Sequence, residues 1–385
     1  LQGQIAGLDV VFNSGDVGSG TQMRLRGNSL LEGDATPLIV VDDNIFEVDE
    51  GTFEFENATN ESFAELLMIN TEDIAEIEVL KDAASCAVWG SRGANGVIKI
   101  KTKRGKRGPT RVNFTYKFKD KWTPNGYNLL NGDDYTMLIK QALFNVNQVG
   151  VDIPELNYDQ TFPEYQNFNN NTDWVDAVSQ HGYRNEYNLN ISGGGEKATF
   201  RISGGYYTQN GQIIKQNLDR FTTRMALDYF VSDRIKVSTN YAMTYTKNKT
   251  NRTALSQAMQ MMPNLSIYYQ DREGKSTGQY YTMLASAPEQ LPHMQNPVAV
   301  AELNKQYNTS LSVQPEFVMT YNIMGLEPGQ HRLTYDGRVT FQVQNSGDDN
   351  YMPAELIADG WTSTQANSIS TSSNKSSNVT TTHTL

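Results

Sequence analysis

Cysteine and histidine are scarce in the 385-residue sequence. Cys86 is the only cysteine, which excludes an internal disulfide and a cysteine metal cluster, and we expect a packed thiol there rather than a reactive one. The four histidines are scattered without the spacing of metal ligands: His181, His293, His331 and His383. We therefore expect neither a metal nor a cofactor.

Long apolar runs and an excess of positive charge are also missing. No stretch of 18 or more apolar residues occurs, so the sequence has no typical transmembrane helix. The 43 acidic and 32 basic residues give a formal net charge of −11, which argues against general nucleic-acid binding. Hydrophobic residues make up 38%, a low share for a long globular chain, whereas aromatic residues reach 10%.

Residues 1 to about 108 read as a small α+β domain, because short strand patterns at 21–27, 37–43, 74–81 and 97–103 surround one alanine-rich helix at 82–89. An acidic loop from Asp42 to Glu56 could bind calcium, but it lacks the EF-hand pattern, and a solvated loop is the simpler interpretation. The basic run from Lys99 to Arg107 indicates a solvated edge, with a lipid-headgroup contact as the alternative.

The stretch "GSRGANG", residues 90–96, has the glycine content of a phosphate-binding loop. Such loops lie between a strand and the N-terminus of a helix. Here the order is reversed, since the helix precedes the loop and the strand "VIKIKTK" follows it. We interpret the glycines as a tight structural connection that needs positive φ angles and close packing.

After Pro109 the pattern changes to strict alternation of apolar and polar residues, as in "RVNFTYKFK" (111–119). A strand places successive side chains on opposite faces, so each segment has one apolar and one polar face. The pattern predicts seven strands, at 111–119, 185–192, 198–208, 220–231, 234–246, 310–323 and 331–343. Pro315 cannot donate a ladder hydrogen bond, which predicts a bulge or a local break in the sixth strand.

Strand length and loop length favour a membrane barrel over a soluble sandwich. Most of the strands run for eight to fourteen residues, whereas ordinary strands have about five or six and a bilayer needs about nine to eleven. Short turns such as "GGGEK" alternate with long loops, as in outer-membrane barrels. An open barrel edge in lipid leaves backbone groups unsatisfied, so we expect the sequence to be a piece of a longer protein.

The segment "DIAEIEVLKDAASCAVWGSRGANGVIKIKTKRG" (73–105) closely resembles the plug signature of SusC/RagA-type TonB-dependent outer-membrane transporters. "RLRG" and "PLIVVDD" resemble two earlier motifs of that plug, and "TDWVDAV" (172–178) and "ISGGGEKATFRISGGYYTQNG" resemble the start of its barrel. The predicted fold is therefore a membrane all-β barrel, of which about seven antiparallel strands are seen, with an N-terminal α+β plug domain over 1–108 and barrel over 109–385. The signature residues carried over are Arg24, Arg26, Gly27, Asp42, Lys81, Asp82, Gly90, Arg92, Gly93, Asn95 and Gly96.

The resemblance implies a 22-stranded barrel that encloses the plug, in the outer membrane of Bacteroidota. It implies active uptake of oligosaccharides or other large nutrients, energised by TonB through a segment upstream of Leu1, with a SusD-like surface lipoprotein as a lid and outer-membrane lipid around the barrel. The sequence departs from the family pattern at Asp43, Cys86 and Trp89.

Other functions remain as alternatives: a passive porin or adhesin barrel, or a TonB-linked importer of peptides or siderophores. A porin lumen is water-filled, so the plug discriminates against that class. A surface glycosidase needs two carboxylates held about 5 to 10 Å apart, and no motif isolates such a pair, so we expect no enzyme.

Two further expectations concern side chains. Arg24, Arg26, Lys81, Asp82 and Arg92 are costly to bury alone, so we expect several to form ion pairs with each other or with wall residues such as Arg201, Arg224 or Asp228. Simple solvation in a wet lumen is the alternative.

Two long predicted loops, 120–184 and 247–309, are rich in aromatic residues. We expect most of these rings to pack the loops internally. A minority, with Trp122, Tyr268 and Tyr269 as candidates, is expected to line the entrance for an oligosaccharide substrate, because aromatic faces suit sugar rings.

Overall fold

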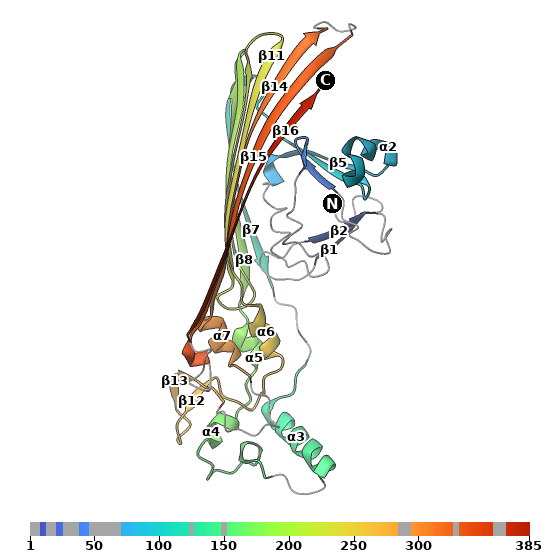
Figure 1. The fold of residues 1–385 in the computed structure, drawn as a ribbon. Coiled ribbons are helices and arrows are strands. Elements are labelled where there is room, and N and C mark those ends of the chain that lie inside the picture. Colours follow the sequence, from blue (N-terminus) through green and yellow to red (C-terminus); the bar gives the residue numbers. More distant parts are fainter. Residues whose placement is uncertain are drawn as a thin grey trace.

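A computed structural model describes residues 8–12, 21–25, 38–45, 71–122, 126, 128–147, 152–283, 294–325, 331–356 and 367–385. A long curved sheet dominates it, a small domain lies beside the concave face of the sheet, and a group of loops with short helices gathers at one end (Figure 1). Within these ranges no helix is both long and apolar enough to cross a membrane.

The long sheet has eight antiparallel strands in a simple up-and-down order. They are β7 (Gly108–Lys121), β8 (Gly182–Gly194), β9 (Ala198–Asn210), β10 (Asn217–Phe230), β11 (Ile235–Lys249), β14 (Lys305–Met324), β15 (Leu333–Met352) and β16 (Ser368–Thr384). Seven of them match the predicted strands. The eighth, β16, was not predicted, because serine, threonine and asparagine give its sequence no apolar alternation.

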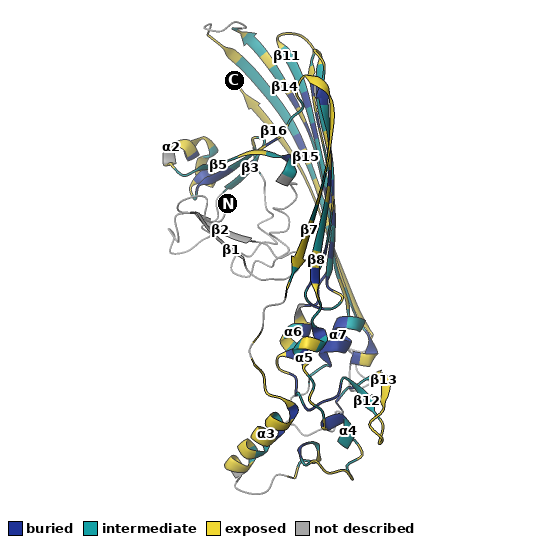
Figure 2. Ribbon diagram, turned by 180° about the vertical axis from the view of Figure 1, so that it is seen from behind, coloured by how far each residue is buried: buried dark blue, intermediate teal, exposed yellow. Residues whose placement is uncertain are grey.

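The apolar face of this sheet is exposed and the polar face is buried, which is the reverse of a sheet in a soluble protein. Large apolar side chains on one face are exposed, such as Phe114 at 64% and Phe317 at 48%. Polar side chains on the other face are buried, such as Ser238 at 2% and Asn240 at 4% (Figure 2). An apolar exterior around a polar interior is the arrangement of a transmembrane barrel wall.

Aromatic residues form a continuous row on the exposed face. The register places Tyr116, Tyr187, Tyr206, Phe221 and Tyr245 opposite one another across β7 to β11. The hydroxyls of Tyr116 and Tyr206 donate to polar side chains further along the sheet, at Asn185 and Asp219. Tyrosines with an apolar ring and a hydrogen-bonded hydroxyl are typical of the bilayer boundary.

Pro315 lies within β14 without a bulge. The register between β14 and β15 is the same on both sides of it. Val313 and Glu316 are each paired with a residue of β15, whereas Gln314 and Pro315 have no partner in that strand. The predicted bulge at this position is wrong, whereas the predicted local break in the ladder is present. The bulge in this pair of strands lies at Asn322–Met324 instead.

The small domain is built on a four-stranded mixed sheet with the order β4-β3-β6-β5. Its elements are β3 (Leu38–Val41), β4 (Asn44–Ile45), η1 (Thr71–Asp73), β5 (Ile74–Leu80), α2 (Ala83–Cys86), η2 (Ala87–Gly93) and β6 (Val97–Thr102). Val40, Cys86 and Val97 form its core. Cys86 is 6% exposed and its thiol donates to the Leu80 carbonyl at 3.4 Å. A separate hairpin is formed by β1 (Leu8–Phe12) and β2 (Thr21–Leu25).

The loops at the end of the sheet pack around one large and two small hydrophobic clusters. They contain α3 (Gly132–Asn147), η3 (Pro154–Leu156), α4 (Tyr165–Phe168), α5 (Trp174–Val178), α6 (Arg252–Ala258), β12 (Tyr268–Gln270), β13 (Ser276–Tyr280), α7 (Pro297–Leu303) and η4 (Ala354–Leu356). Residues from both long loops, among them Phe168, Trp174, Met262 and Tyr281, are buried together. The loops therefore form an ordered cap over one end of the sheet.

Candidate functional site

Three segments of the small domain meet the polar face of the long sheet. They are the β3–β4 turn, the short helix η1, and the chain that follows β6. Each contributes charged side chains that pair with charged residues of the sheet. Except for Arg104, which is 35% exposed, these charged partners are largely removed from water, and we take this contact as the candidate functional site.

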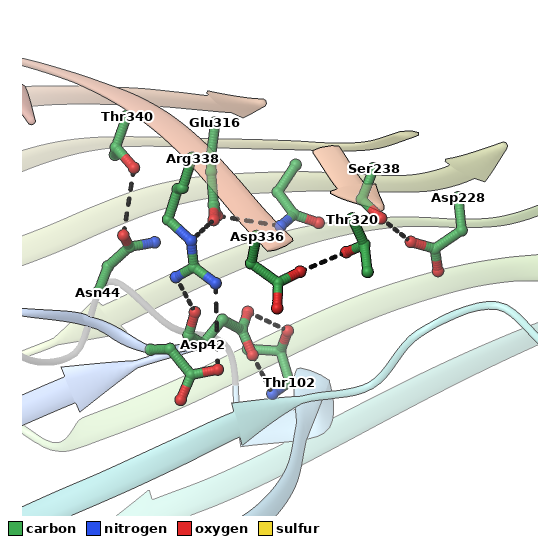
Figure 3. Close-up of polar contacts among 12 residues, drawn as sticks. Asp42, Asn44, Thr102, Asp228, Ser238, Glu316, Thr320, Asp336, Arg338 and Thr340 are labelled. Carbon is green, nitrogen blue, oxygen red and sulfur yellow. Dashed lines mark hydrogen bonds and ion pairs between the residues drawn. The ribbon is translucent and has the colours of Figure 1, made fainter. Parts of the chain in front are cut away.

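Asp42 contacts three residues at this surface, and Figure 3 shows two of them, Thr102 and Arg338. Its carboxylate accepts hydrogen bonds from the backbone N–H of Thr102 at 2.8 Å, from the Thr102 hydroxyl at 2.6 Å, and from Arg224 of β10. Its carbonyl accepts one from Arg338 of β15 at 2.6 Å. One residue thereby ties β6 of the small domain to two distant strands of the long sheet.

The backbone places Asp42 at this point. Asp42 and Asp43 have φ angles of 48° and 66°, the two positive values that a type I′ hairpin turn requires between paired strands. Aspartate tolerates this region better than most residues. The turn also exposes Asp43, which pairs with Lys99 at 2.6 Å.

The helix η1 supplies the second contact. Asp73, 3% exposed, accepts from Arg201 of β9 at 3.0 Å and from the Ser203 hydroxyl at 2.6 Å. Its neighbour Glu72 accepts a hydrogen bond from Lys117 of β7, and this bond lowers the pKa of the Glu72 carboxyl.

The third contact follows β6, where Arg104 donates to Asp228 of β10 at 3.0 Å. Asp228 also accepts from the Ser238 hydroxyl at 2.5 Å. At this point the chain runs very close to the wall, because a Cβ added to Gly105 would lie 2.4 Å from the carbonyl oxygen of Phe200 in β9. Only glycine permits that approach.

We refer to Asp42–Arg224, Asp73–Arg201, Arg104–Asp228 and Glu72–Lys117 as the docking pairs. Burying a charge without a partner is expensive, and removing one member of a buried pair costs about 3–5 kcal/mol. The pairs therefore fix the position of the small domain against the sheet. The contact between the small domain and the sheet is thus polar and charged rather than a fused hydrophobic core.

Comparisons with known proteins agree with this architecture. The family model described as "TonB-dependent Receptor Plug Domain" matches residues 1–97. "TonB-dependent receptor SusC" of Bacteroides thetaiotaomicron is 31% identical over 290 residues, which cover 74% of this chain and 26% of that protein. The chain belongs to the SusC/RagA-like TonB-dependent receptors. "TonB-dependent receptor P3" of Formosa agariphila is 27% identical over 372 residues, covering 93% of this receptor and 32% of that protein.

Solved structures show the same fold. The RagAB peptide transporter superposes with a TM-score of 0.70 at 22% identity, over 92% of this chain and 40% of that chain, and the "open-open" state of the RagAB peptide importer gives 0.71 at 20%. The receptor thus spans between a quarter and a third of the curated relatives it matches. Its family consists of outer-membrane transport proteins of Gram-negative bacteria rather than enzymes.

With the family established, the small domain is the plug and the long sheet is part of the barrel wall. Plug and wall are joined by ion pairs that use the expected wall residues Arg201, Arg224 and Asp228. The expected pairing of the plug residues Arg24, Arg26, Lys81, Asp82 and Arg92 stays a prediction. The partners of the wall residues are Asp73, Asp42 and Arg104, of which Asp42 was a signature residue and none was an expected ion-pair partner. Glu72, Asp73 and Arg104 were missed, although each lies in or beside the predicted plug strands and carries a charge.

The glycine-rich signature is a structural connection, as expected. Gly90 has a φ of 62° and Gly96 a φ of 94°, and a Cβ on Gly93 would lie 2.7 Å from the Cys86 carbonyl oxygen. The remaining signature residues Lys81, Asp82, Arg92 and Asn95 surround this turn. Arg24 lies on β2, whereas Arg26, Gly27 and the acidic loop beyond Ile45 fall outside the described residues.

The three aromatic candidates differ in their surroundings. Trp122 is 77% exposed and its ring lies edge-on to His181 at 5.3 Å. Tyr269 packs edge-on against the buried Tyr281 at 4.8 Å, and its hydroxyl donates to the Thr282 carbonyl. Tyr268 stacks on Tyr280 at 5.1 Å, where burial raises the pKa of Tyr280 to about 12. Trp122 is thus the candidate most open to a ligand, and a substrate contact stays a prediction for all three.

Proposed function

We propose that the receptor imports large nutrients through the outer membrane, with the plug closing the lumen until TonB acts on it. The observation that carries this proposal is the plug seated on the polar face of the wall by the docking pairs. A passive pore has no use for such a domain, since it obstructs a lumen that must stay water-filled. The plug comprises residues 1–108 in this proposal, and β7 begins at Gly108.

The proposed cargo is an oligosaccharide. Support comes from the polar face of the wall, where hydroxyl and amide side chains follow one another across the strands: Thr222, Thr244, Ser312 and Gln344 are successive partners in the register of β10, β11, β14 and β15. Groups that both donate and accept suit the hydroxyl rim of a sugar. Trp122 offers an exposed ring for the opposite, apolar face of the sugar.

Import of peptides is the second candidate, and the similarity of fold to the RagAB peptide importer favours it. The same structures support a SusD-like lipoprotein as the partner. In this proposal the partner covers the loop cap, where α3 exposes Met137, Leu138 and Phe144 at 50% or more. An exposed apolar helix face of this kind is typical of a protein interface.

Uptake in a strain that lacks the receptor gene tests the proposal. Labelled oligosaccharides and labelled peptides of similar mass are offered to the deletion strain, to the complemented strain, and to a complemented strain without TonB. We expect oligosaccharide accumulation only where both receptor and TonB are present. Accumulation that continues without TonB would contradict active import, and uptake restricted to peptides would replace the proposed cargo.

A further inference from the structure

Positive charges are concentrated on the inner face of the first strands of the wall. Lys119 and Lys121 of β7 lie on the same face as Lys117, which bonds to the plug. Phe118, between Lys117 and Lys119, belongs to the exposed apolar face. Arg184 of β8 is the register partner of Lys119. Arg220 of β10 lies on the same face as Arg224, which also bonds to the plug. This concentration stands out in a chain with a net charge of −11.

The two arginines share one aromatic partner. The guanidinium of Arg184 lies 5.4 Å from the ring centre of Tyr207 in β9, and that of Arg220 lies 5.5 Å from the same centre. Contacts of this kind hold a cation in place while its N–H groups remain directed elsewhere. Glu186 accepts one bond from Arg184 at 2.8 Å, and the buried Nε of Arg184 has no hydrogen-bond partner among the described residues.

These residues lie between the plug and the loop cap. Lys117, one inward-facing position before Lys119, makes the plug contact through Glu72. Lys121 ends β7, and β8 begins opposite it at Gly182, so the long loop starts directly beyond. Any molecule that passes from the cap to the plug along this part of the wall must pass the cluster formed by Lys119, Lys121, Arg184 and Arg220, which we call the cationic station.

The salt bridge to Glu186 offsets the charge of Arg184, whereas among the described residues Lys119 pairs with no carboxylate. Like charges directly opposite each other on neighbouring strands are destabilising, yet Lys119 and Arg184 are register partners on one face. Lys119 is exposed and Arg184 keeps part of its side chain accessible. Arg220, by contrast, is only 8% exposed and lies behind them. Accessible cations side by side on one face are typical of a binding site whose ligand supplies the opposite charge.

We propose that the cationic station binds the acidic groups of the imported substrate, which is therefore an oligosaccharide bearing carboxylate or sulfate. This inference rests on the proposed function and specifies its cargo. A planar guanidinium matches either oxyanion through paired N–H bonds, and a lysine adds a mobile point charge. In the register of the wall, Arg220 is followed by Thr246, Ser310 and Ser346. The station thus continues into a row of hydroxyls, which suits the neutral part of a sugar chain.

Equilibrium binding to the full-length receptor, measured by calorimetry, tests the proposal. The probes are a tetrasaccharide of galacturonate, a neutral maltotetraose and a tetraglutamate peptide. The variants are Lys119→Gln, which changes an exposed side chain with little risk to folding, and the double substitution Lys119→Gln with Arg184→Gln. Lys236→Gln is the matched control. Lys236 of β11 lies on the same inner face of the wall as the station, but close to the turn at the other end of the sheet.

We expect galacturonate to bind at least about tenfold more tightly than maltotetraose, to lose affinity as salt is raised, and to lose about tenfold more in the double variant but not in the control. Equal affinities for the charged and neutral sugars, or no effect of the substitutions, would overturn the proposal that the station binds acidic sugars. The proposed import of oligosaccharides would then still stand. Binding of tetraglutamate alone would overturn both the station's sugar ligand and the proposed cargo.

Discussion

At the scale of single residues, Asp42 has the largest predicted effect on the attachment of the plug. Replacement by asparagine keeps the shape of the side chain and removes the charge that Arg224 faces. Because Arg224 and Asp42 are both largely buried, we expect Asp42→Asn to lower the stability of the docked plug by about 3 kcal/mol. Thermal unfolding of the full-length receptor in detergent measures this loss.

The neighbouring residue gives a matched control for that prediction. Asp43 has the same charge and a positive φ, but its side chain is 55% exposed, and it pairs closely only with the plug residue Lys99 at 2.6 Å, the wall residue Arg338 lying at 4.0 Å. An exposed pair contributes at most about 1 kcal/mol, so Asp43→Asn is expected to leave the unfolding temperature nearly unchanged. Equal shifts for the two substitutions would show that Asp42 acts through the turn and not through the wall.

Glu72 makes plug attachment dependent on pH. Its pKa is lowered, chiefly by the hydrogen bond from Lys117, so the ionised form is favoured in the docked state. The stabilisation is therefore complete above the pKa of the unfolded chain and is lost as pH falls through the lower pKa of the folded receptor. We expect wild type to be more stable than Glu72→Gln near pH 7 and the difference to shrink as the pH falls below the ordinary range of a glutamate carboxyl, about 4. A constant difference across this range would contradict the assignment.

The sequence predicted the wall side of the site better than the plug side. Arg201, Arg224 and Asp228 stand at polar positions of strictly alternating strands, so their face could be inferred. Asp73 and Arg104 stand at strand ends, where alternation carries no information about direction. Their partners depend on how the plug is rotated against the wall, which only the tertiary structure determines.

At the scale of elements, the strands are longer than the alternation indicates. The pattern for β14 covers 310–323, whereas the strand runs from Lys305 to Met324. The polar ends of β14 and β15, and the whole of β16, extend the sheet without any apolar face. Such segments become strands because a neighbour supplies hydrogen bonds, and this information is absent from local sequence.

The loop cap is held by a buried aromatic core. Trp174 is 3% exposed, and its indole N–H donates to the Met262 carbonyl at 2.9 Å, which joins the two long loops. Loss of a buried tryptophan costs about 3–5 kcal/mol. We expect Trp174→Ala to open both loops to limited proteolysis on intact cells, with cleavage between residues 122 and 181 or between 250 and 304.

Trp122 provides the comparison for the loop experiment. It has the same chemistry as Trp174 but is 77% exposed, so Trp122→Ala is expected to leave the protease pattern unchanged and to weaken substrate binding instead. Rapid cleavage in Trp122→Ala, or resistance in Trp174→Ala, would show that the core of the cap is not built as described.

At the scale of the whole molecule, the long sheet combines an apolar face with a polar face. The apolar face of the sheet is directed outward and carries the aromatic row, while the polar face is directed inward and carries the docking pairs and the cationic station. This division follows from a period of two, and it was fully predictable from the sequence. The position of the plug against the inner face followed from the family resemblance, since no local pattern specifies it.

We expect the docked plug to close the lumen of the receptor. Conductance across a planar lipid bilayer tests it most directly, with the full-length receptor and a variant that lacks residues 1–107. We predict that the full-length receptor is electrically silent and that the plugless variant conducts steadily, as a wide water-filled barrel does. A full-length receptor that conducts as well as the plugless variant would contradict the claim and identify the protein as a passive pore.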